Sequence, residues 1–556
     1  MHLQGADIYY VSMESMQRPR TKSSVFVFLI FTFGATVLAD DVHHHSQPPQ
    51  TVGNVSFPIS CSQRAQSQVE QGLARMHSFL FDAAEDRFKA AVREDSSCAM
   101  AYWAQAIGLY RPLVYAPSDA DMKQAWAFIQ KAQTLKPATQ RERDYVAAAA
   151  VLFTPDERSF DERSHEYAAA MEKIYSKYPK DREAAVFYAL SLLTSTDSKD
   201  PIANSEKAIA ILNPVFHENP DNPGVAHYLI HAADSPRLAH AGLEAARRYA
   251  RIASASPHAL HMPSHIFARL GLWREDIRSN LESLKAAQNP TGVYVGAENQ
   301  LHAMEFLEYA YLQIGDDKRA KEMMEAQARV DLAQVDKNLQ DYVNHTRANS
   351  PALYYLETRN WKAAEALQPD LNAEPYNQAI THWARAIAAG HLHDIATAED
   401  AVNRYDALLE ATKTGPRPER AKHMTTRRDE AHAWLYVLQG KDQEAIALLQ
   451  ALADKQDAEG KGEIELPARE MLADVLLEIN RPSEALAEYE KSLSVDPNRF
   501  NGLYGAGRVA QLLGQSEKQR KYYSQLLKSC AANSRRPELT IARAGTARAK
   551  PLKKRP

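Results

Sequence analysis

Histidines recur between residues 223 and 309 at spacings that suit a transition-metal site. His227 and His231 form an H-x3-H pair, and His261 and His265 form a second pair in the following repeat. Residues four apart lie on the same face of a helix, one turn apart. Neutral imidazole is a good ligand for Zn, Cu or Fe, and packed helices bring facing pairs within reach of a common point. The two pairs therefore predict a metal site in which the identity of the metal and the number of ions, one or two, stay open.

Three further residues extend this pattern. His258 and His261 form H-x2-H, and His302 and Glu305 have the same spacing further along the chain. The interval between these two pairs is longer than one repeat, and an insertion around 289–292 accounts for the excess. The predicted metal ligands are His227, His231, His261, His265, His302, His258 and Glu305. The alternative is that each histidine is a core residue hydrogen-bonded to a neighbour, with no metal at all.

The elements that must position these histidines are helices that recur with a period of about 34 residues. Gly72 is followed by small or aromatic residues at offsets of 12, 16 and 19, and Ala473 is followed by the same kinds of residue at the same offsets. Small residues let two helices approach closely, and an aromatic ring fills the remaining space. Internal repeats of this length indicate stacked helix pairs.

The segments QGLARMHSFLFDAAEDRFKAAVREDSS and LADVLLEINRPSEALAEYEKSLSVDPN resemble the tetratricopeptide-repeat (TPR) family. The resemblance covers residues 54–533 and implies an all-α fold, a TPR-type α-solenoid in which antiparallel helix pairs form a right-handed superhelix. It also implies that the first helix of each pair, and with it the histidine registers, faces a concave groove that holds a peptide or protein partner. The HMPSH segment at 261–265 resembles one found in bacterial secreted TPR proteins.

Proline complicates the second histidine pair. Ser256 and Pro257 read as an N-cap and a first-turn proline, so a helix is expected to begin just before His258. Pro263 then falls between His261 and His265, where we expect it to kink the helix. If the helix began at Pro263 instead, His258 and His261 would lie in a loop and their register would be lost.

Composition excludes several classes of protein. Apolar residues make up 45% of the 556 residues, which is too many for a disordered chain. The 66 Lys and Arg residues are balanced by 70 Asp and Glu residues, so no nucleic-acid partner is expected. The H-E-x-x-H, G-x-S-x-G, P-loop and C-x-x-C motifs are absent from the sequence.

The ends of the chain predict export. Residues 25–38 form an apolar run, preceded by basic residues and followed by Ala39, as in a secretory signal peptide over 1–39. The run is shorter than the ~20 residues of a membrane-spanning helix, so no stable span is expected once the signal is removed. A periplasmic or secreted location follows. Residues 40–53 are expected to be a flexible leader, and 534–556 a basic, disordered tail.

An oxidising compartment allows a disulfide between Cys61 and Cys98, with Cys530 left over. The alternative is a pair of buried free thiols.

Three functional hypotheses follow. The first is an exported TPR binding protein with a structural or ligand-binding metal in its groove. The second is a metalloenzyme, a hydrolase or oxidoreductase, in which Glu305 or Glu298 moves protons. The third is a metal-free interaction scaffold. The first is favoured, because the scaffold is well marked whereas no catalytic nucleophile or acid is.

Overall fold

The computed structural model describes residues 51–113, 117–195, 202–288, 296–331, 335 and 339–546. These residues form helices and connecting loops, with no strand among them. The helices are α1 (Gln63–Met76), α2 (Phe81–Glu94), α3 (Ala99–Leu109), α4 (Asp119–Leu135), α5 (Gln140–Phe153), α6 (Phe160–Lys177), α7 (Arg182–Thr194), α8 (Ala203–Glu218), α9 (Pro223–Ala233), α10 (Ala239–Ile252), α11 (Pro257–His261), α12 (Pro263–Arg269), α13 (Trp273–Ala287), α14 (Ala297–Gln313), α15 (Asp317–Ala328), α16 (Gln340–Glu357), α17 (Trp361–Glu365), α18 (Pro375–Leu392), α19 (Ile395–Lys413), the 3-10 helix η3 (Pro418–Arg420), α20 (Ala421–Leu438), α21 (Asp442–Glu459), α22 (Ala468–Glu478), α23 (Pro482–Val495), α24 (Phe500–Leu512), α25 (Ser516–Ser529) and α26 (Glu538–Thr546).

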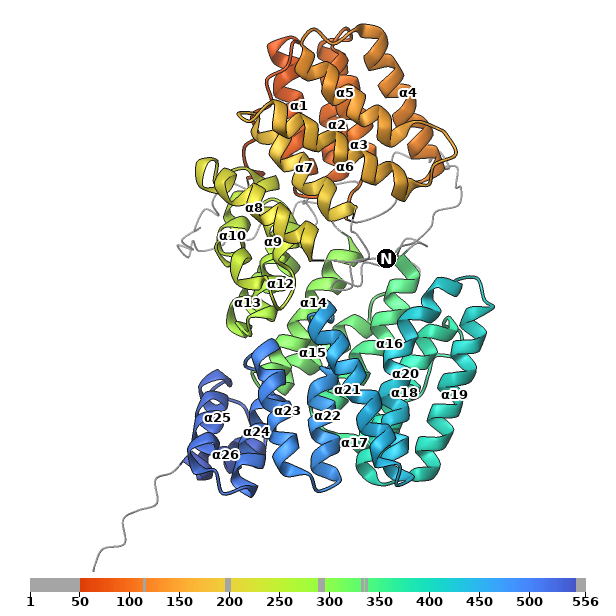
Figure 1. Ribbon diagram of the computed structural model, residues 1–556, viewed down its shortest axis with the longest axis vertical. Helices are drawn as coiled ribbons and strands as arrows, with labels where there is room; N and C mark the ends of the chain where they lie inside the picture. Colours follow the sequence, from red (N-terminus) through yellow and green to blue (C-terminus); the bar gives the residue numbers. More distant parts are fainter. Residues whose placement is uncertain are drawn as a thin grey trace, which may run out of the picture.

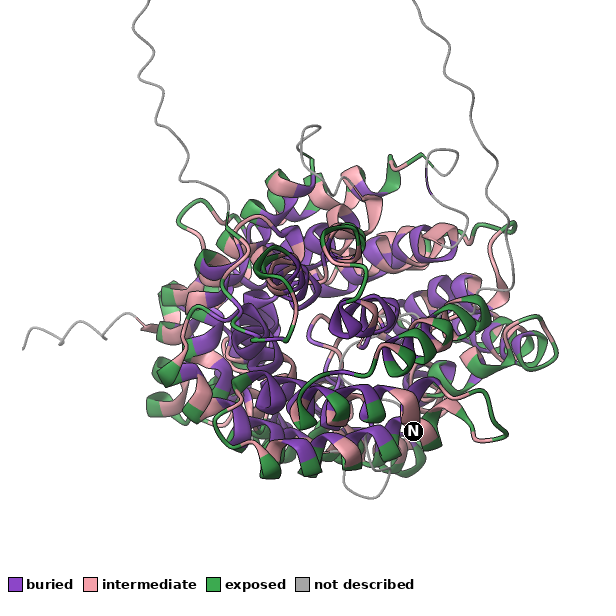
Figure 2. Cartoon of the chain, turned by 90° about the horizontal axis from the view of Figure 1, so that it is seen from above, coloured by how far each residue is buried: buried purple, intermediate pink, exposed green. Residues whose placement is uncertain are grey.

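The predicted fold class is confirmed. Successive helices pack against one another along the chain and build an α-solenoid, which Figure 1 shows from the red N-terminal repeats to the blue C-terminal ones. Viewed from above, buried residues gather on the inner helices and exposed residues along the outer rim (Figure 2). Each pair buries its apolar face against its neighbours, which is why the core runs along the length of such a stack.

The regular offset between a small residue and an aromatic one has a direct packing cause. A Cβ atom added to Gly72 would lie 2.2 Å from the Phe88 ring, and one added to Gly507 would lie 2.4 Å from the Tyr523 ring. Both distances are shorter than a van der Waals contact, so glycine is what lets the aromatic ring of the second helix rest on the first. The repeat seen in the sequence is therefore a helix-packing register.

The C-terminal repeats return to the middle of the chain. Trp273 Nε1 donates a hydrogen bond to the carbonyl of Asn498 at 2.9 Å, and the amide of Ala531 donates to the carbonyl of Ile314 at 2.8 Å. In Figure 1 the blue helices α23 and α24 accordingly lie next to the green helices α14 and α15. Segments far apart in the sequence thus share one interface.

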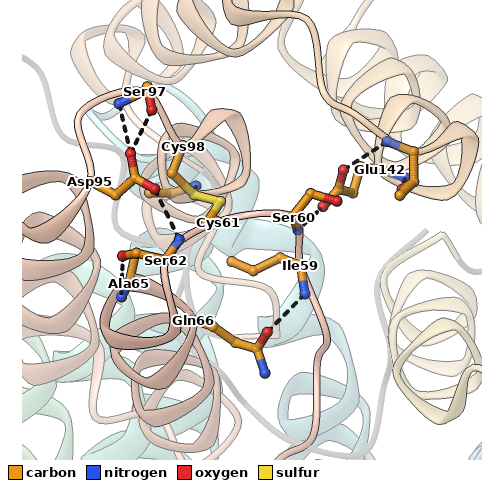
Figure 3. Close-up of a disulfide and its surroundings, with 12 residues drawn as sticks. Ile59, Ser60, Cys61, Ser62, Ala65, Gln66, Asp95, Ser97, Cys98 and Glu142 are labelled. Carbon is orange, nitrogen blue, oxygen red and sulfur yellow. Dashed lines mark hydrogen bonds between the residues drawn. A yellow bond between two sulfur atoms is a disulfide. The ribbon is translucent and has the colours of Figure 1, made fainter.

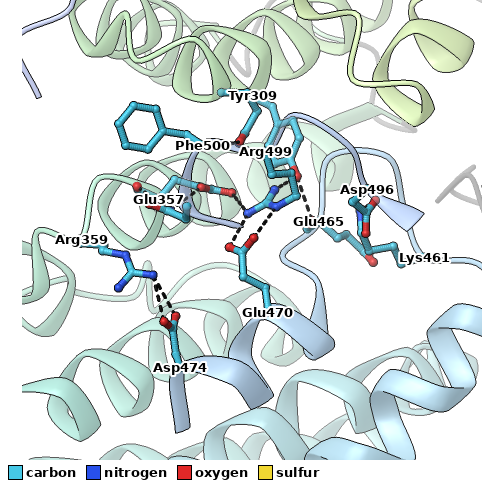
Figure 4. Close-up of polar contacts among 12 residues, drawn as sticks. Tyr309, Glu357, Arg359, Lys461, Glu465, Glu470, Asp474, Asp496, Arg499 and Phe500 are labelled. Atoms are coloured by element: carbon cyan, nitrogen blue, oxygen red, sulfur yellow. Dashed lines mark hydrogen bonds and ion pairs between the residues drawn. The ribbon is translucent and has the colours of Figure 1, made fainter. Parts of the chain in front are cut away.

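A buried ion cluster ties this interface together. Arg499, just before α24, donates to Glu470 at 3.0 Å through Nε and to Glu357 at 2.8 Å through Nη2 (Figure 4). Its Nη1 also donates to the Tyr309 hydroxyl on α14, and that hydroxyl donates to the carbonyl of Glu465 at 3.1 Å. We call Tyr309, Glu357, Glu470 and Arg499 the Arg499 cluster. It joins α14, α16, α22 and the start of α24, and it positions the loop before α22.

Cys61 and Cys98 form a disulfide, with their Cα atoms 5.3 Å apart (Figure 3). The bond joins the segment before α1 to the N-cap of α3. Of the two alternatives left open by the sequence, the structure therefore has the bridge. Cys530 is a buried free thiol.

The ends differ from expectation where the structure describes them. The predicted signal peptide, residues 40–50 of the leader and residues 547–556 of the tail lie outside the described residues. Thr51, expected in the flexible leader, donates from Oγ1 to the carbonyl of Ile252 at 2.9 Å. The tail prediction is wrong for 538–546, which form α26, because Leu539 and Ala542 find an apolar surface to be buried against. Among the described helices, none has both the length and the hydropathy needed to cross a bilayer.

Candidate metal centre

Helix α9 presents the first histidine pair. Asn222 caps its N-terminus by accepting from the amides of Gly224 and Val225, and a proline occupies the first turn. His227 is fully buried and His231 partly buried, one turn apart on the same face, as their spacing predicts.

The second pair straddles a break between two short helices. Ser256 accepts a hydrogen bond from the amide of Ala259 and starts α11, as expected. Instead of an interior kink, Pro263 begins a separate helix, α12, because it has no N–H to continue the hydrogen bonds of α11. Met262 between them keeps right-handed helical angles, with φ −49° and ψ −34°. His258 and His261 therefore remain helical, and their register is preserved.

The first of two histidine sets consists of His227, His231 and His258, which we call trio A. Its ring nitrogens converge, since His227 Nε2 lies 3.0 Å from His258 Nε2 and 3.1 Å from His231 Nε2. The ring of Phe79 stacks on His258 with 4.7 Å between centroids, and meets His227 edge-on at 4.5 Å.

The second set consists of His261, His265 and His302, which we call trio B. His261 Nε2 lies 3.0 Å from His265 Nε2, and the His302 ring centroid lies 4.3 Å from that of His261. One ring nitrogen from each of the three lies within 4.8 Å of the others, as is also true of trio A. The ring of Phe306 covers this set at 4.8 Å from His261.

Trio B repeats trio A one step along the solenoid. His227, His231 and His258 map in that order onto His261, His265 and His302. The first two are shifted by one repeat, and the third by one repeat together with the insertion. Each trio takes two histidines from one repeat and the third from the next. The two trios are therefore equivalent arrangements of histidines, displaced from each other by one repeat.

This arrangement corrects the prediction of one common point. His227 and His231 do not share a set with His261 and His265, because on α11 His258 points back toward α9 while His261 points on toward α14. Glu305 belongs to neither set. Glu305 occupies the position in its repeat that His227 and His261 occupy in theirs, and Tyr309 occupies the position of the second histidine. The Glu305 carboxylate accepts a hydrogen bond from the Tyr342 hydroxyl. Glu298, which the enzyme hypothesis named as a residue that moves protons, lies in the first turn of α14.

Hydrogen bonds fix which ring nitrogen faces each set. His227 Nδ1 donates to the carbonyl of His77 at 2.7 Å. His261 Nδ1 donates to Asn280 Oδ1 at 2.6 Å, because the Asn280 amide nitrogen already donates to Asp276. In a neutral imidazole with Nδ1 protonated, Nε2 carries the lone pair. The lone pairs of His227 and His261 thus point into their trios, as metal-ligating histidines require.

Acidic side chains support only trio B. His265 Nδ1 lies 2.9 Å from Asp234 Oδ2 and 3.0 Å from Glu463 Oε1. Arg269 Nε donates to Asp234 Oδ1 at 3.0 Å, and its Nη1 donates to the carbonyl of Lys461. Asp234 follows the first histidine pair directly in the sequence, whereas Glu463 comes from the loop between α21 and α22 and had no sequence signal.

The surroundings set the protonation of five of the six rings. Burial lowers the pKa of His227, His258 and His261 well below the usual range, and lowers the pKa of His231 to about 3. His265 behaves differently. Burial also acts to lower its pKa, but the carboxylates of Glu463 and Asp234 outweigh that effect and raise the pKa to about 10. Four rings are therefore neutral bases at pH 7, and the fifth is held beside two carboxylates.

His77 serves the site through its backbone. Its ring is buried, with Nε2 3.0 Å from Glu183 and Nδ1 2.9 Å from the Tyr228 hydroxyl, so it packs in the core. Its carbonyl receives the His227 Nδ1 proton and so orients a ring of trio A.

Residues 466–499 match the model of the tetratricopeptide repeat family. Among solved structures, the chain is similar to the human IFIT1 dimer with m7Gppp-AAAA, at 14% identity and a TM-score of 0.35 over 82% of this chain and 94% of that one. It is also similar to a tetratricopeptide repeat protein from Parabacteroides merdae, at 14% identity and a TM-score of 0.26 over 52% and 97%. The P58(IPK) TPR domain is 14% identical, with a TM-score of 0.23 over 82% and 99%. No curated protein matches the chain at a significant level.

Proposed function

We propose that this chain, a solenoid of tetratricopeptide repeats, is an exported binding scaffold that holds transition-metal ions in its two histidine trios. The observation that carries the proposal is the convergence of ring nitrogens: His227 Nε2 lies 3.0–3.1 Å from its two partners in trio A, His261 Nε2 lies 3.0 Å from His265 Nε2 in trio B, and one nitrogen of each residue in a trio lies within 4.8 Å of the others. Three nitrogens at metal distances of ~2.0–2.1 Å, spread at tetrahedral angles, lie about 3.3 Å apart. The spacing inside the trios is thus close to that of three imidazoles around one ion.

Electrostatics is compatible with the same proposal. Both His261 and His265 use Nδ1 for hydrogen bonds to fixed acceptors, so their Nε2 atoms face each other at 3.0 Å. The raised pKa of His265 places a proton between these two atoms in the metal-free protein, and a bound ion would take the place of that proton. Zn, Cu and Fe are the ions that imidazole ligands suit.

Metal analysis of the full chain tests the proposal. The protein, purified after export and stripped with a chelator, is titrated with Zn²⁺ and, without oxygen, with Cu(I), each against a chromophoric competitor, and bound metal is counted by elemental analysis. Counting both ions together, we expect two equivalents of bound metal for the wild type, one for His231→Gln, one for His302→Gln and none for the double variant. His217→Gln, an exposed histidine on α8, is the matched control and should retain two. Wild-type protein that binds no Zn²⁺, Cu or Fe, or trio variants that bind as much as the wild type, would contradict the proposal.

A second candidate function is a metal-dependent enzyme. It is favoured by the count of three histidines per trio, since catalytic sites commonly leave a fourth position for water or substrate. The His302 side chain is 40% exposed, which gives trio B access to solvent. Cobalt-substituted protein distinguishes the two cases. Azide should shift its visible absorption if a coordination position is open, whereas a closed four-ligand site should not respond.

The scaffold role concerns the groove. TPR folds bind peptides or proteins, and we propose such a partner for this chain. Affinity capture from the exported fraction, with wild type and the double trio variant compared, tests whether metal and partner binding are linked. A partner held equally by both would show that they are independent.

A further inference from the structure

The two trios are copies in sequence, yet their surroundings carry different charge. Trio A is enclosed by neutral groups. The ring of Phe79 covers His258 and His227, the Tyr249 ring stacks on His227 with 5.2 Å between centroids, and the acceptor for His227 Nδ1 is a backbone carbonyl. The Asp234 carboxylate acts on His231 only through space, because its hydrogen bonds go to His265 and Arg269, and none of the groups named here brings a carboxylate into contact with a ring of trio A.

Trio B is placed among anions. Asp234 and Glu463 both lie within 3.0 Å of His265 Nδ1, and the guanidinium of Arg269 compensates one of these two negative charges. Glu305 adds another, with Oε2 3.7 Å from His302 Nδ1. The ammonium of Lys461 is paired with Asp496 at 3.1 Å and adds no net charge. With its three rings neutral, as metal ligation requires, trio B therefore has a surplus of about two negative charges.

An ion buried by neutral ligands retains its full charge in a low-dielectric site. The free-energy cost of burying an ion in such a site rises with the square of its charge, so it is about four times larger for a divalent ion than for a monovalent ion of similar size. Carboxylates next to a ligand histidine offset the charge of a divalent ion and raise the basicity of the ring. Copper is the imidazole-binding metal that is stable as a monovalent ion.

We infer that the two trios form an unlike pair, in which trio A takes monovalent copper and trio B takes a divalent ion such as Zn²⁺. The inference rests on the proposed function, since it presupposes that the trios bind metal. It predicts selectivity from charge alone, because the two sets share the same ligand type and the same register.

Paired titrations of the full chain test this. Cu(I) is added without oxygen against a Cu(I)-specific chromophoric chelator, and Zn²⁺ is added separately against its own chelator. We expect one tight Cu(I) and one tight Zn²⁺. His231→Gln should weaken Cu(I) binding and spare Zn²⁺, whereas His302→Gln should do the reverse, each by at least about tenfold. His217→Gln should alter neither.

A fourth variant isolates the charge argument. Glu463→Gln keeps all six imidazoles and removes one carboxylate, so it should weaken Zn²⁺ at trio B by about 10- to 100-fold and leave Cu(I) at trio A unchanged. Circular dichroism confirms that each variant is folded, and His302, being the most exposed ligand, gives a trio B variant with little risk of unfolding.

The outcomes separate the inference from the proposal beneath it. Two sites with equal preference for Zn²⁺ and Cu(I), or an exchange of the expected ions between the trios, overturn the inference and leave the metal proposal standing. A wild type that binds neither ion overturns both. Retention of full Zn²⁺ affinity by Glu463→Gln overturns the charge argument that assigns the divalent ion to trio B.

Discussion

Removing Arg499 should open the interface between the middle and the C-terminal repeats. The side chains of Arg499 and Glu357 are 1% and 0% exposed, and that of Glu470 is 7% exposed. Replacing Arg499 with Met keeps most of its volume but leaves both carboxylates buried without their cation. Breaking a buried ion pair in this way costs about 3–5 kcal/mol.

The two carboxylates are affected unequally. Glu357 keeps a hydrogen bond from the Asn501 amide at 2.9 Å, whereas Glu470 loses both bonds that Arg499 donates to it. Burial already raises the pKa of Glu470, and Arg499 opposes that rise. In the Arg499→Met variant the folded state therefore binds a proton that the unfolded chain releases. Stability is then greatest at low pH and is lost as pH rises, so the variant should be weakest near pH 8 and recover toward pH 5.

Hydrogen exchange measures the loss of stability helix by helix. Such a local measurement is needed because a solenoid of this length need not unfold in one step. Amide protection in α22 and α24 should fall by about 100-fold to several thousand-fold at pH 8, the equivalent of 3–5 kcal/mol. Arg404→Met is the control, since the Arg404–Asp400 pair is 60% and 44% exposed and should change protection little. Adding Glu470→Gln to the Arg499 variant should restore part of the loss.

The reasoning is refuted if Arg499→Met costs less than about 1 kcal/mol, or if its cost is the same at pH 5 and pH 8. Either result would mean that water reaches the carboxylates and that the cluster does not hold the interface. The outcome also bears on trio B, because the loop that carries Glu463 is anchored through Tyr309, a member of the same cluster.

Three further predictions concern other parts of the chain. Replacing both Cys61 and Cys98 by Ala should destabilise the N-terminal repeats by about 2–4 kcal/mol in urea, since the bond joins positions separated by 37 in the sequence, and an unchanged midpoint would speak against that. Gly505→Ala should cost about 1–3 kcal/mol in thermal unfolding, because the added Cβ would lie 2.3 Å from the facing tyrosine ring. Gly296→Ala is its control, with the nearest atom at 3.7 Å, and equal effects of the two would refute the packing argument. Burial raises the pKa of Glu430 to about 8 from 4.5, so the folded state keeps a proton through that range and stability falls as pH rises from 4.5 to 8. Glu430→Gln should flatten this part of the pH profile of urea midpoints, and a variant curve parallel to the wild type would exclude the assignment.

Local packing made the helical repeats readable from the sequence. An aromatic residue at a fixed offset after a glycine predicts a helix pair because the ring of the second helix rests where the first has no side chain, as Gly72 and Phe88 do. The positions of the histidines on their helices could likewise be predicted from local sequence spacing. His227 and His231 share a helix face because they are one turn apart, and a shift by one repeat places His261 and His265 in the same register.

Only the tertiary structure divided the ligands between two sets. His258 and His261 lie one turn apart on α11, yet the first joins helix α9 and the second joins α14, since the crossing of neighbouring helices decides which way each ring points. The sequence register contained the copy relation, but it did not show that a trio takes its third ring from the next repeat.

Glu463, which supplies part of the charge around trio B, had no sequence signal. Glu463 reaches His265 from a distant part of the sequence because the solenoid turns back on itself and lays the loop before α22 over the site. Periodicity reports contacts between neighbouring repeats, and it is silent on contacts made by the curvature of the whole superhelix. The candidate ligands were therefore predictable from the local repeat, whereas the crossing of neighbouring helices decided how they divide into two sets, and the curvature of the stack decided which charges surround trio B.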